Sequence, residues 1–211
     1  MNVIIKYVYL QIEKNRIKDK RRVMKKSAIF LFILVASILT AAAKSDVEVI
    51  KGSLAELKSS DAKMFVRWDY SNSTIEGKAV KTYLKEQGPD WERDYDAEIA
   101  RAEENFRERL ADKSSDVTTV TSEQTADYII VMKVSDFQYG SAALSAAIGF
   151  GAGDAHLSGK MEIYKKGSKT PIAVLDVDGV PGAGYGNEIR RVNAYRELAE
   201  NLAKLIKKAK K

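Results

Sequence analysis

The chain has one histidine and no cysteine, so few side chains are available for nucleophilic catalysis. His156 lies two residues after Asp154 and two residues before Ser158, and these are the three residue types of a serine-hydrolase triad. In a triad the histidine contacts the serine on one side and the acid on the other, and three neighbours along one strand do not have this mutual geometry. The sequence therefore predicts no catalytic residue, and we expect that the chain is not an enzyme.

Metal ligands are equally scarce. A zinc site needs several histidine, cysteine or carboxylate ligands, and this chain offers one imidazole. Asp176 and Asp178 share one face of a predicted strand, where they could hold a hard cation or, if they met in a cleft, serve an enzyme. Paired acids on an exposed strand face are usually only solvated. We therefore predict no metal and no other cofactor.

Two glycine-rich stretches invite a comparison with nucleotide-binding loops, residues 149–153 (GFGAG) and 182–186 (GAGYG). The second follows a predicted strand and precedes a predicted helix, which is the correct local order. However, Asn187 stands at the third glycine position of the dinucleotide motif, and the Lys-Ser/Thr pair of a phosphate loop is missing. We interpret this stretch as a flexible connection.

The segment before residue 44 has the three parts of an export signal. Lys25 and Lys26 are its positive start, residues 28–40 are an uncharged apolar run, and residues 41–43 are three alanines that fit a cleavage site. A membrane anchor is the alternative, but spanning a bilayer takes about 20 apolar residues. We expect translation to start at Met24, cleavage before Lys44, and a single exported domain at residues 44–211.

The net charge of +6 belongs to this leader. Nine of the 35 Lys and Arg and two of the 29 Asp and Glu lie in residues 1–43, so the remaining chain has a formal charge of −1. A basic domain that would suggest nucleic-acid binding is therefore absent from the sequence. Without cysteine the chain also lacks the residue that bacterial lipoproteins lipidate, so we expect a periplasmic or envelope-associated product that is not lipidated.

Two segments have the spacing of amphipathic helices, at about 90–111 and 187–208. The first has acids in its first turn and arginines near its end, and its apolar stripe consists of Trp91, Tyr95, Ile99, Ala102, Phe106 and Leu110. The second has Asn187 as a candidate cap and lysines in its last turn, and its stripe consists of Ile189, Val192, Tyr195, Leu198, Ala199, Leu202, Leu205 and Ile206. A shorter helix is predicted over 77–87, before Gly88-Pro89.

The predicted strands are grouped in the middle of the chain and are not alternated regularly with helices. They are a short run at 47–49 and the segments 62–70, 128–134, 155–164 and 171–179, the last two joined as a hairpin. This grouping predicts an α+β domain, a two-layer sandwich of one mixed or mainly antiparallel sheet of about 4–5 strands packed with the two long helices.

Residues 141–153 (SAALSAAIGFGAG) contain no charge and lie between two predicted strands. The segment is too apolar for an ordinary solvated loop. It either covers one face of the sheet or is an exposed patch for a partner or membrane. For the second case we expect Leu144, Ile148 and Phe150 to be the partner-binding residues.

The middle of the chain resembles an uncharacterised family of bacterial envelope proteins, many of which are lipoproteins. The similarity is carried by Ala126-Asp127-Tyr128, Asp136-Phe137, Gly140-Ser141, Ala143-Leu144 and the stretch 148–153. The resemblance implies an export signal and an α/β domain distantly similar to curli-assembly lipoproteins and to the N-terminal domain of TolB. It transfers no catalytic residue, and the missing lipidation cysteine departs from the family pattern.

These observations favour a non-catalytic exported envelope protein that acts through protein–protein interaction or self-assembly. The alternative is a periplasmic carrier of a small ligand or lipid, with its cavity between the helix at 91–110 and the sheet. The partner is expected to be an envelope protein or a second copy and not a nucleic acid. The lysines of the C-terminal tail leave peripheral membrane contact as a further alternative, although they also suit a helix C-terminus.

Overall fold

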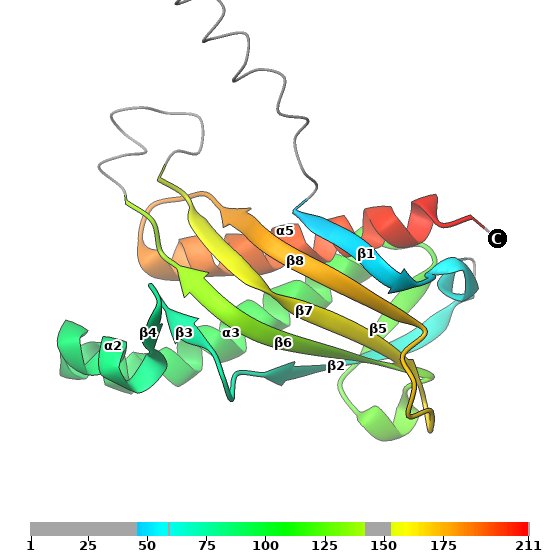
Figure 1. Ribbon diagram of the computed structural model, residues 1–211, viewed down its shortest axis with the longest axis horizontal. Coiled ribbons are helices and arrows are strands. Elements are labelled where there is room, and N and C mark those ends of the chain that lie inside the picture. The colour runs from blue at the N-terminus through cyan, green and yellow to red at the C-terminus, as the bar shows by residue number, and fades with distance from the viewer. Residues whose placement is uncertain (1–45, 59, 142–152, 211) are drawn as a thin grey trace, which may run out of the picture. The chain divides into compact units, whose positions relative to one another are not determined.

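The computed structural model describes residues 46–58, 60–141 and 153–210 (Figure 1). The described residues form an eight-stranded sheet with the strands β1 Val47–Gly52, β2 Ala62–Asp69, β3 Thr74–Ile75, β4 Lys78–Ala79, β5 Val117–Val120, β6 Tyr128–Gln138, β7 Ala155–Lys165 and β8 Ala173–Gly182. The helices are α2 Val80–Gln87, α3 Pro89–Lys113 and α5 Asn187–Lys208, with the short 3₁₀ turns η1 Ala55–Leu57 and η2 Glu123–Thr125. The predicted leader lies outside the described residues.

The sheet is mixed, as the sequence predicted. Its main order is β1-β8-β7-β6-β2-β5, and the short β3 pairs with β4 and with the end of β6. The pairs from β1 to β6 are antiparallel, whereas β2 runs parallel to both β6 and β5. Parallel neighbours need a crossover connection, and α2 and α3 supply the one between β2 and β5.

Both long helices lie on the same face of the sheet, so the predicted two-layer α+β architecture is present (Figure 1). Pro89 is the first residue of α3, where its missing N–H costs no hydrogen bond. The face of α3 that meets the core contributes Ala102, Phe106 and Leu110. For α5 the predicted cap was wrong by one residue, because Gly186 is the N-cap and Asn187 already belongs to the helix.

The predicted strand number of about 4–5 was too low. The strands that were missed, β3, β4 and β5, have two to four residues, which is too short for an alternating pattern to be recognised. Because β4 takes up Lys78–Ala79, the short helix begins at Val80 instead of residue 77. The strand predicted at 128–134 continues to Gln138.

The two faces of the sheet differ in burial. Along β6, Tyr128, Ile130 and Met132 are buried beneath the helices, whereas Ile129 and Val131 point the other way and are only half-buried. No described helix or strand covers that second face, which we call the open face. In the described part of the chain, no helix has the length and apolarity needed to cross a membrane.

Candidate functional site

The three predicted partner-binding residues, Leu144, Ile148 and Phe150, lie outside the described residues. The structure does describe where their segment starts and ends. The Ser141 N–H donates to the carbonyl oxygen of Gly153 at 3.0 Å, so the ends of the segment meet where β6 and β7 are joined. Gly140 allows this close approach, since a Cβ there would lie 2.2 Å from the carbonyl oxygen of Asp154.

Two of the candidate triad residues, His156 and Ser158, form hydrogen bonds with the backbone of β8. His156 Nδ1 lies 3.0 Å from the carbonyl oxygen of Gly179, and the Gly179 N–H donates to Ser158 Oγ at 3.0 Å. The register of the β7–β8 pair shifts at this position, and both side chains stabilise the irregularity. Among the described residues, none of the hydrogen bonds joins His156 to Ser158 or Asp154.

The paired acids of β8 do not form a metal cluster. Asp176 has Lys160 of β7 opposite it on one side and Glu48 of β1 on the other, so one amine and one further carboxylate are its cross-strand neighbours. In the described ranges, no group of three or more His, Cys, Asp or Glu side chains is close enough to hold a metal ion.

The second glycine-rich stretch packs tightly at its first residue, so the predicted flexible connection was wrong there. A Cβ on Gly182 would lie 2.0 Å from the carbonyl oxygen of Arg190, so only glycine lets α5 approach β8 this closely. Arg190 then fixes the stretch, because its Nε donates to the Gly184 carbonyl and its Nη1 to the Tyr139 carbonyl, both at 2.9 Å.

A buried arginine occupies the centre of an aromatic cluster beneath the helices. Arg191 of α5 is 1% exposed, and its guanidinium carbon lies 4.8 Å from the ring centre of Tyr95 and 4.9 Å from those of Phe137 and Tyr139. Its Nη2 donates to the hydroxyl of Tyr139. Its Nε and Nη1 have no hydrogen-bond partner among the described residues, which is uncommon for a buried charged group.

A chain of hydrogen bonds lies beside this arginine. The Tyr70 hydroxyl donates to Glu103 Oε1 at 2.9 Å and lies 3.1 Å from the hydroxyl of Tyr195. Burial raises the pKa of the Glu103 carboxyl and the pKa of the Tyr70 hydroxyl, because the charged form of each loses hydration. Trp68 packs against the Tyr195 ring at 4.8 Å between centroids and holds the chain in place.

A cleft of about 510 Å³ opens between α3 and the end of β2. Trp68 and Tyr70 form one wall, Tyr95 and Ile99 of α3 form the other, and Glu103 lies at its border. This is where the sequence placed the cavity of a ligand carrier, between the helix at 91–110 and the sheet. A small cavity of about 10 Å³ adjoins the cleft, shares Tyr70, Ser73, Tyr95 and Ile99 with it, and is also lined by Arg191.

The open face carries a strip of half-buried apolar side chains, Phe65, Ile129, Val131 and Tyr164, which we call the apolar strip. Phe65, Ile129 and Tyr164 are cross-strand neighbours on β2, β6 and β7. Ion pairs of both signs border the strip: Lys133 with Glu162 at 2.8 Å, and Arg67 with Glu123 at 2.5 Å. Together they surround a shallow hollow of about 290 Å³.

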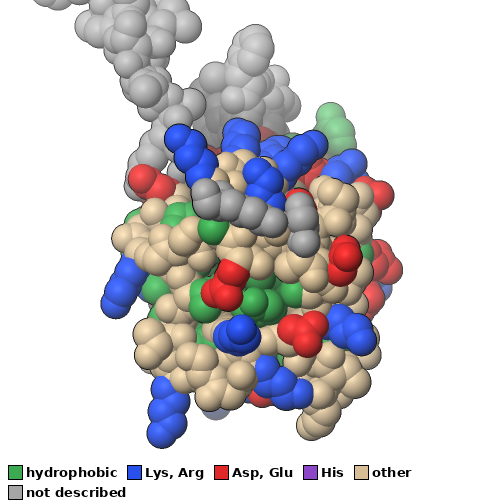
Figure 2. Space-filling model, turned by 90° about the vertical axis from the view of Figure 1, so that its right-hand side faces the viewer, with side chains coloured by type: hydrophobic (Ala, Val, Ile, Leu, Met, Phe, Trp, Pro, Cys, Tyr) green, Lys and Arg blue, Asp and Glu red, His purple; other side chains and the backbone are tan. Residues whose placement is uncertain are grey.

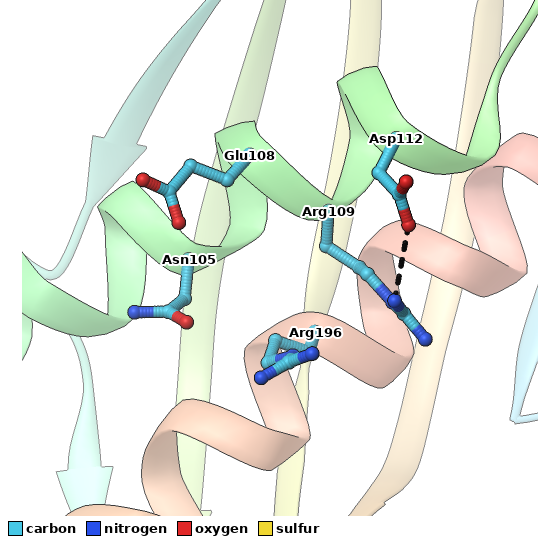
Figure 3. Close-up of a pocket in the computed structure, with 5 residues that line it drawn as sticks. All are labelled: Asn105, Glu108, Arg109, Asp112 and Arg196. Atoms are coloured by element: carbon cyan, nitrogen blue, oxygen red, sulfur yellow. Dashed lines mark hydrogen bonds and ion pairs between the residues drawn. The ribbon is translucent and has the colours of Figure 1, made fainter.

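The groove between the two long helices is a charged surface. In Figure 3, Asn105, Glu108, Arg109 and Asp112 come from α3 and Arg196 comes from α5. Arg109 is paired with Asp112 at 3.1 Å and also with Glu200 of α5. The hollow measures about 180 Å³ and its charges are largely compensated, so we interpret it as a solvated seam between helices.

The end of the domain that carries the C-terminus of α5 combines both charge signs with apolar atoms. Figure 2 shows hydrophobic side chains in the middle of this end, Lys and Arg gathered along its upper edge and scattered below, and acidic side chains between them. Lys58 donates to the Ala209 carbonyl at 3.0 Å and ties the end of α5 to η1. The interspersed acids weaken the attraction that the tail lysines alone would have for an anionic membrane.

The sequence interpretation missed Arg191 and misplaced one end of the α5 stripe. Ile189, predicted to be core, is 52% exposed, and Arg190 and Arg191 are buried in its place. A signal for this exists in the sequence, because Arg191 precedes Tyr195 by four residues and Leu198 by seven, which puts all three on one helix face. Because charged residues are rarely buried, the sequence interpretation placed Ile189, and not Arg191, on the buried face of α5.

Comparison with known proteins identifies a family and a set of related structures. The model of the family described as a domain of unknown function (DUF4410) matches residues 47–184. No functionally curated protein matches the sequence. Two structures of PelC dodecamers from Paraburkholderia phytofirmans, one of them a point variant, are similar at 12% sequence identity, with TM-scores of 0.38 and 0.39. The match covers 74% and 73% of this chain and 96% of each PelC chain.

Proposed function

The chain belongs to the DUF4410 family, a domain of unknown function, and on that premise we propose that it is a non-catalytic exported envelope protein that acts by associating with copies of itself. The observation that carries this proposal is the open face of the sheet. A sheet whose second face stays uncovered normally shows polar residues there, in alternation with its buried face. Here the apolar strip interrupts that alternation toward the start of β6 and the end of β7, beside the charged cross-strand row of Lys133, Lys160 and Asp176.

The charges around the apolar strip favour a protein partner over a membrane. Two basic side chains, Arg67 and Lys133, and two acidic ones, Glu123 and Glu162, line the hollow over the strip, so this lining has no excess of either sign. An anionic lipid surface would be attracted by a basic border and repelled by an acidic one. A two-fold pairing of identical faces can bring the basic groups of one copy against the acidic groups of the other.

The non-catalytic role is supported by what the candidate triad residues do. His156 and Ser158 are both engaged with the backbone of Gly179. The envelope location rests on the sequence pattern of residues 24–43. Within the uncharged segment 141–153, we propose Leu144, Ile148 and Phe150 as further contact residues.

The absence of cysteine allows a direct test of the face used for association. A Val131→Cys variant places one thiol on the apolar strip, and an Ala97→Cys variant places one on the exposed side of α3 as a control. With a short bis-maleimide crosslinker, the Val131→Cys protein should give covalent dimers and the Ala97→Cys protein should not. Equal yields, or dimers only through α3, would contradict the proposed face.

The cleft beside α3 favours a second candidate function, that of a small-ligand carrier. Ligand sites in proteins are usually apolar hollows of about 300–1,000 Å³ with a few placed polar groups, and this cleft of about 510 Å³ matches that description. Native mass spectrometry of the protein purified from its own envelope tests this candidate. A retained ligand would support it, and a mass equal to that of the polypeptide alone would count against it.

A further inference from the structure

We propose that the cleft between α3 and β2 binds a small molecule carrying one oxyanion, a carboxylate or a phosphate monoester, and that Arg191 binds this oxyanion. The inference rests on the carrier candidate and adds the chemical class of its ligand. Arg191 is the buried side chain concerned, because its Nε and Nη1 have no hydrogen-bond partner among the described residues.

Arg191 is a buried charge that has no ion-pair partner among the described residues. Removal of a guanidinium from water is strongly unfavourable unless other groups replace the lost hydration. Three aromatic rings and the hydroxyl of Tyr139 replace part of it. No acid among the described residues pairs with Arg191, and its Nε and Nη1 have no acceptor there in hydrogen-bond geometry. The Tyr95 hydroxyl is nevertheless close: burial raises its pKa, and Arg191 acts in the opposite direction. The planar guanidinium fork fits carboxylate and phosphate oxygens better than any other common group.

Arg191 lines a small cavity that adjoins the cleft. The cavity lined by Arg191 measures about 10 Å³, which is enough for one water molecule or one ligand oxygen. Four side chains, Tyr70 and Tyr95 among them, line both this cavity and the cleft, so the two hollows adjoin. The cleft is therefore the route by which an acceptor from outside could reach the arginine.

The cleft walls restrict the rest of the ligand. Trp68, Tyr70, Tyr95 and Ile99 offer aromatic and aliphatic surface, which suits an apolar chain or ring. Asp96 and Glu103 lie at the border of the cleft and would repel a second anionic group at the far end of a ligand. A single anionic group on an apolar body fits both conditions, whereas a dicarboxylate does not.

Binding of simple probes to the purified Trp91→Phe protein, in which Trp68 is the remaining tryptophan, tests the proposal, with tryptophan fluorescence and isothermal titration calorimetry as readouts. Octanoate and octyl phosphate should bind at least about tenfold more tightly than uncharged octanol, since a hydrogen bond to a charged group contributes on the order of 1.5–3 kcal/mol. The relative affinities of the two anions identify the oxyanion. Octanedioate should bind more weakly than octanoate. Equal binding of octanol and octanoate, or no binding of either anion, would overturn the proposal.

Two kinds of variant test the contribution of Arg191 and the contribution of the cleft separately. In Arg191→Met, octanoate should lose at least about tenfold in affinity while octanol is unchanged, because only the charged contact is removed. If this variant does not fold, Ala100→Trp obstructs the cleft from an exposed position, and Ala97→Trp on the same helix is its control. Binding that survives Ala100→Trp would overturn the assignment of the cleft. If octanol binds with the same affinity as octanoate, the carrier function would still be supported, and only the role of Arg191 would be excluded.

Discussion

Arg191 has two properties that are rarely found together in one side chain, deep burial and a permanent charge. If it mainly stabilised the fold, its replacement by an apolar side chain of similar length would be costly. If it is retained for a ligand, the same replacement relieves an incompletely solvated charge, as has been found for buried ion pairs replaced by apolar residues. The stability of one variant therefore distinguishes these roles.

We predict that Arg191→Met is at least as stable as the wild-type protein, with a gain of up to about 2 kcal/mol in the free energy of unfolding. Urea denaturation followed by circular dichroism measures this difference. Arg191→Ala, which leaves a cavity, is the comparison and should be less stable than the Met variant. A loss of several kcal/mol in Arg191→Met would indicate that the arginine is needed for folding.

Glu103 should make the stability of the protein depend on pH. Burial raises its pKa in the folded state above the ordinary value of 4.5, despite the hydrogen bond from Tyr70 that acts in the opposite direction. The folded state therefore binds this proton more tightly than the unfolded state. The resulting stabilisation is fully present below the unfolded pKa and is lost as pH rises through the folded pKa.

Glu103→Gln removes this titration and keeps an oxygen that can accept from the Tyr70 hydroxyl. We predict that, as pH rises from 4 toward neutrality, the wild-type protein loses stability relative to Glu103→Gln. Thermal unfolding of both proteins across that range gives the difference directly. A constant difference between the two curves would mean that the carboxyl titrates alike in both states.

At the scale of elements, the contact between α5 and β8 depends on one glycine. Gly182 is buried, and a Cβ there would be 2.0 Å from the backbone oxygen of Arg190 and 2.9 Å from the Cβ of Ala194. The first of these contacts involves backbone, which cannot move without displacing the helix. Arg190 and Arg191 lie on this same turn of α5. A displacement of the turn would therefore also disturb the cluster around Tyr139.

We predict that Gly182→Ala lowers the free energy of unfolding by about 3 kcal/mol, at the upper end of the cost of overpacking. A Gly182→Ala/Ala194→Gly double variant should not recover this loss, since it removes the side-chain contact and leaves the backbone contact. Chemical denaturation of the single and double variants measures both values. Full recovery in the double variant would show that the close approach involves side chains only.

Long elements were predictable from the sequence, and short ones were not. The helices at 89–113 and 187–208 and the strands β2, β6, β7 and β8 each have enough residues for a helical or alternating pattern to appear. β3 and β5 are defined by their partners, since Thr74–Ile75 pairs with β6 and Val117–Val120 pairs with β2. Such pairing depends on contacts between residues distant in sequence, which local patterns do not encode.

The candidate site was predictable in position and not in chemistry. The stripe of α3 predicted that Tyr95 and Ile99 face the sheet, and the cleft lies there. The arginine at its base was not found, because the stripe of α5 was centred on Ile189, which is exposed. Where a helix buries a charged residue for a reason other than packing, an analysis based on hydrophobicity places the buried face wrongly.

For the whole molecule, the two-layer architecture leaves one face of the sheet without a described cover, and we propose that copies of the chain associate through it. A strip such as Phe65, Ile129, Val131 and Tyr164 would otherwise remain in contact with water. Burial of apolar area contributes about 25 cal/mol per Å², so association through this face is favourable if the two surfaces fit.

Sedimentation velocity of the purified mature protein measures this association. We predict that the wild-type protein sediments as a dimer or larger species, that Ile129→Asp sediments as a folded monomer, and that Ile189→Asp, a matched change at an exposed position of α5, assembles like the wild type. A charge placed in a desolvated contact is strongly unfavourable, whereas the same charge on a solvated surface is not. A wild-type protein that is monomeric at all concentrations, or an Ile129→Asp variant that assembles unchanged, would contradict the account.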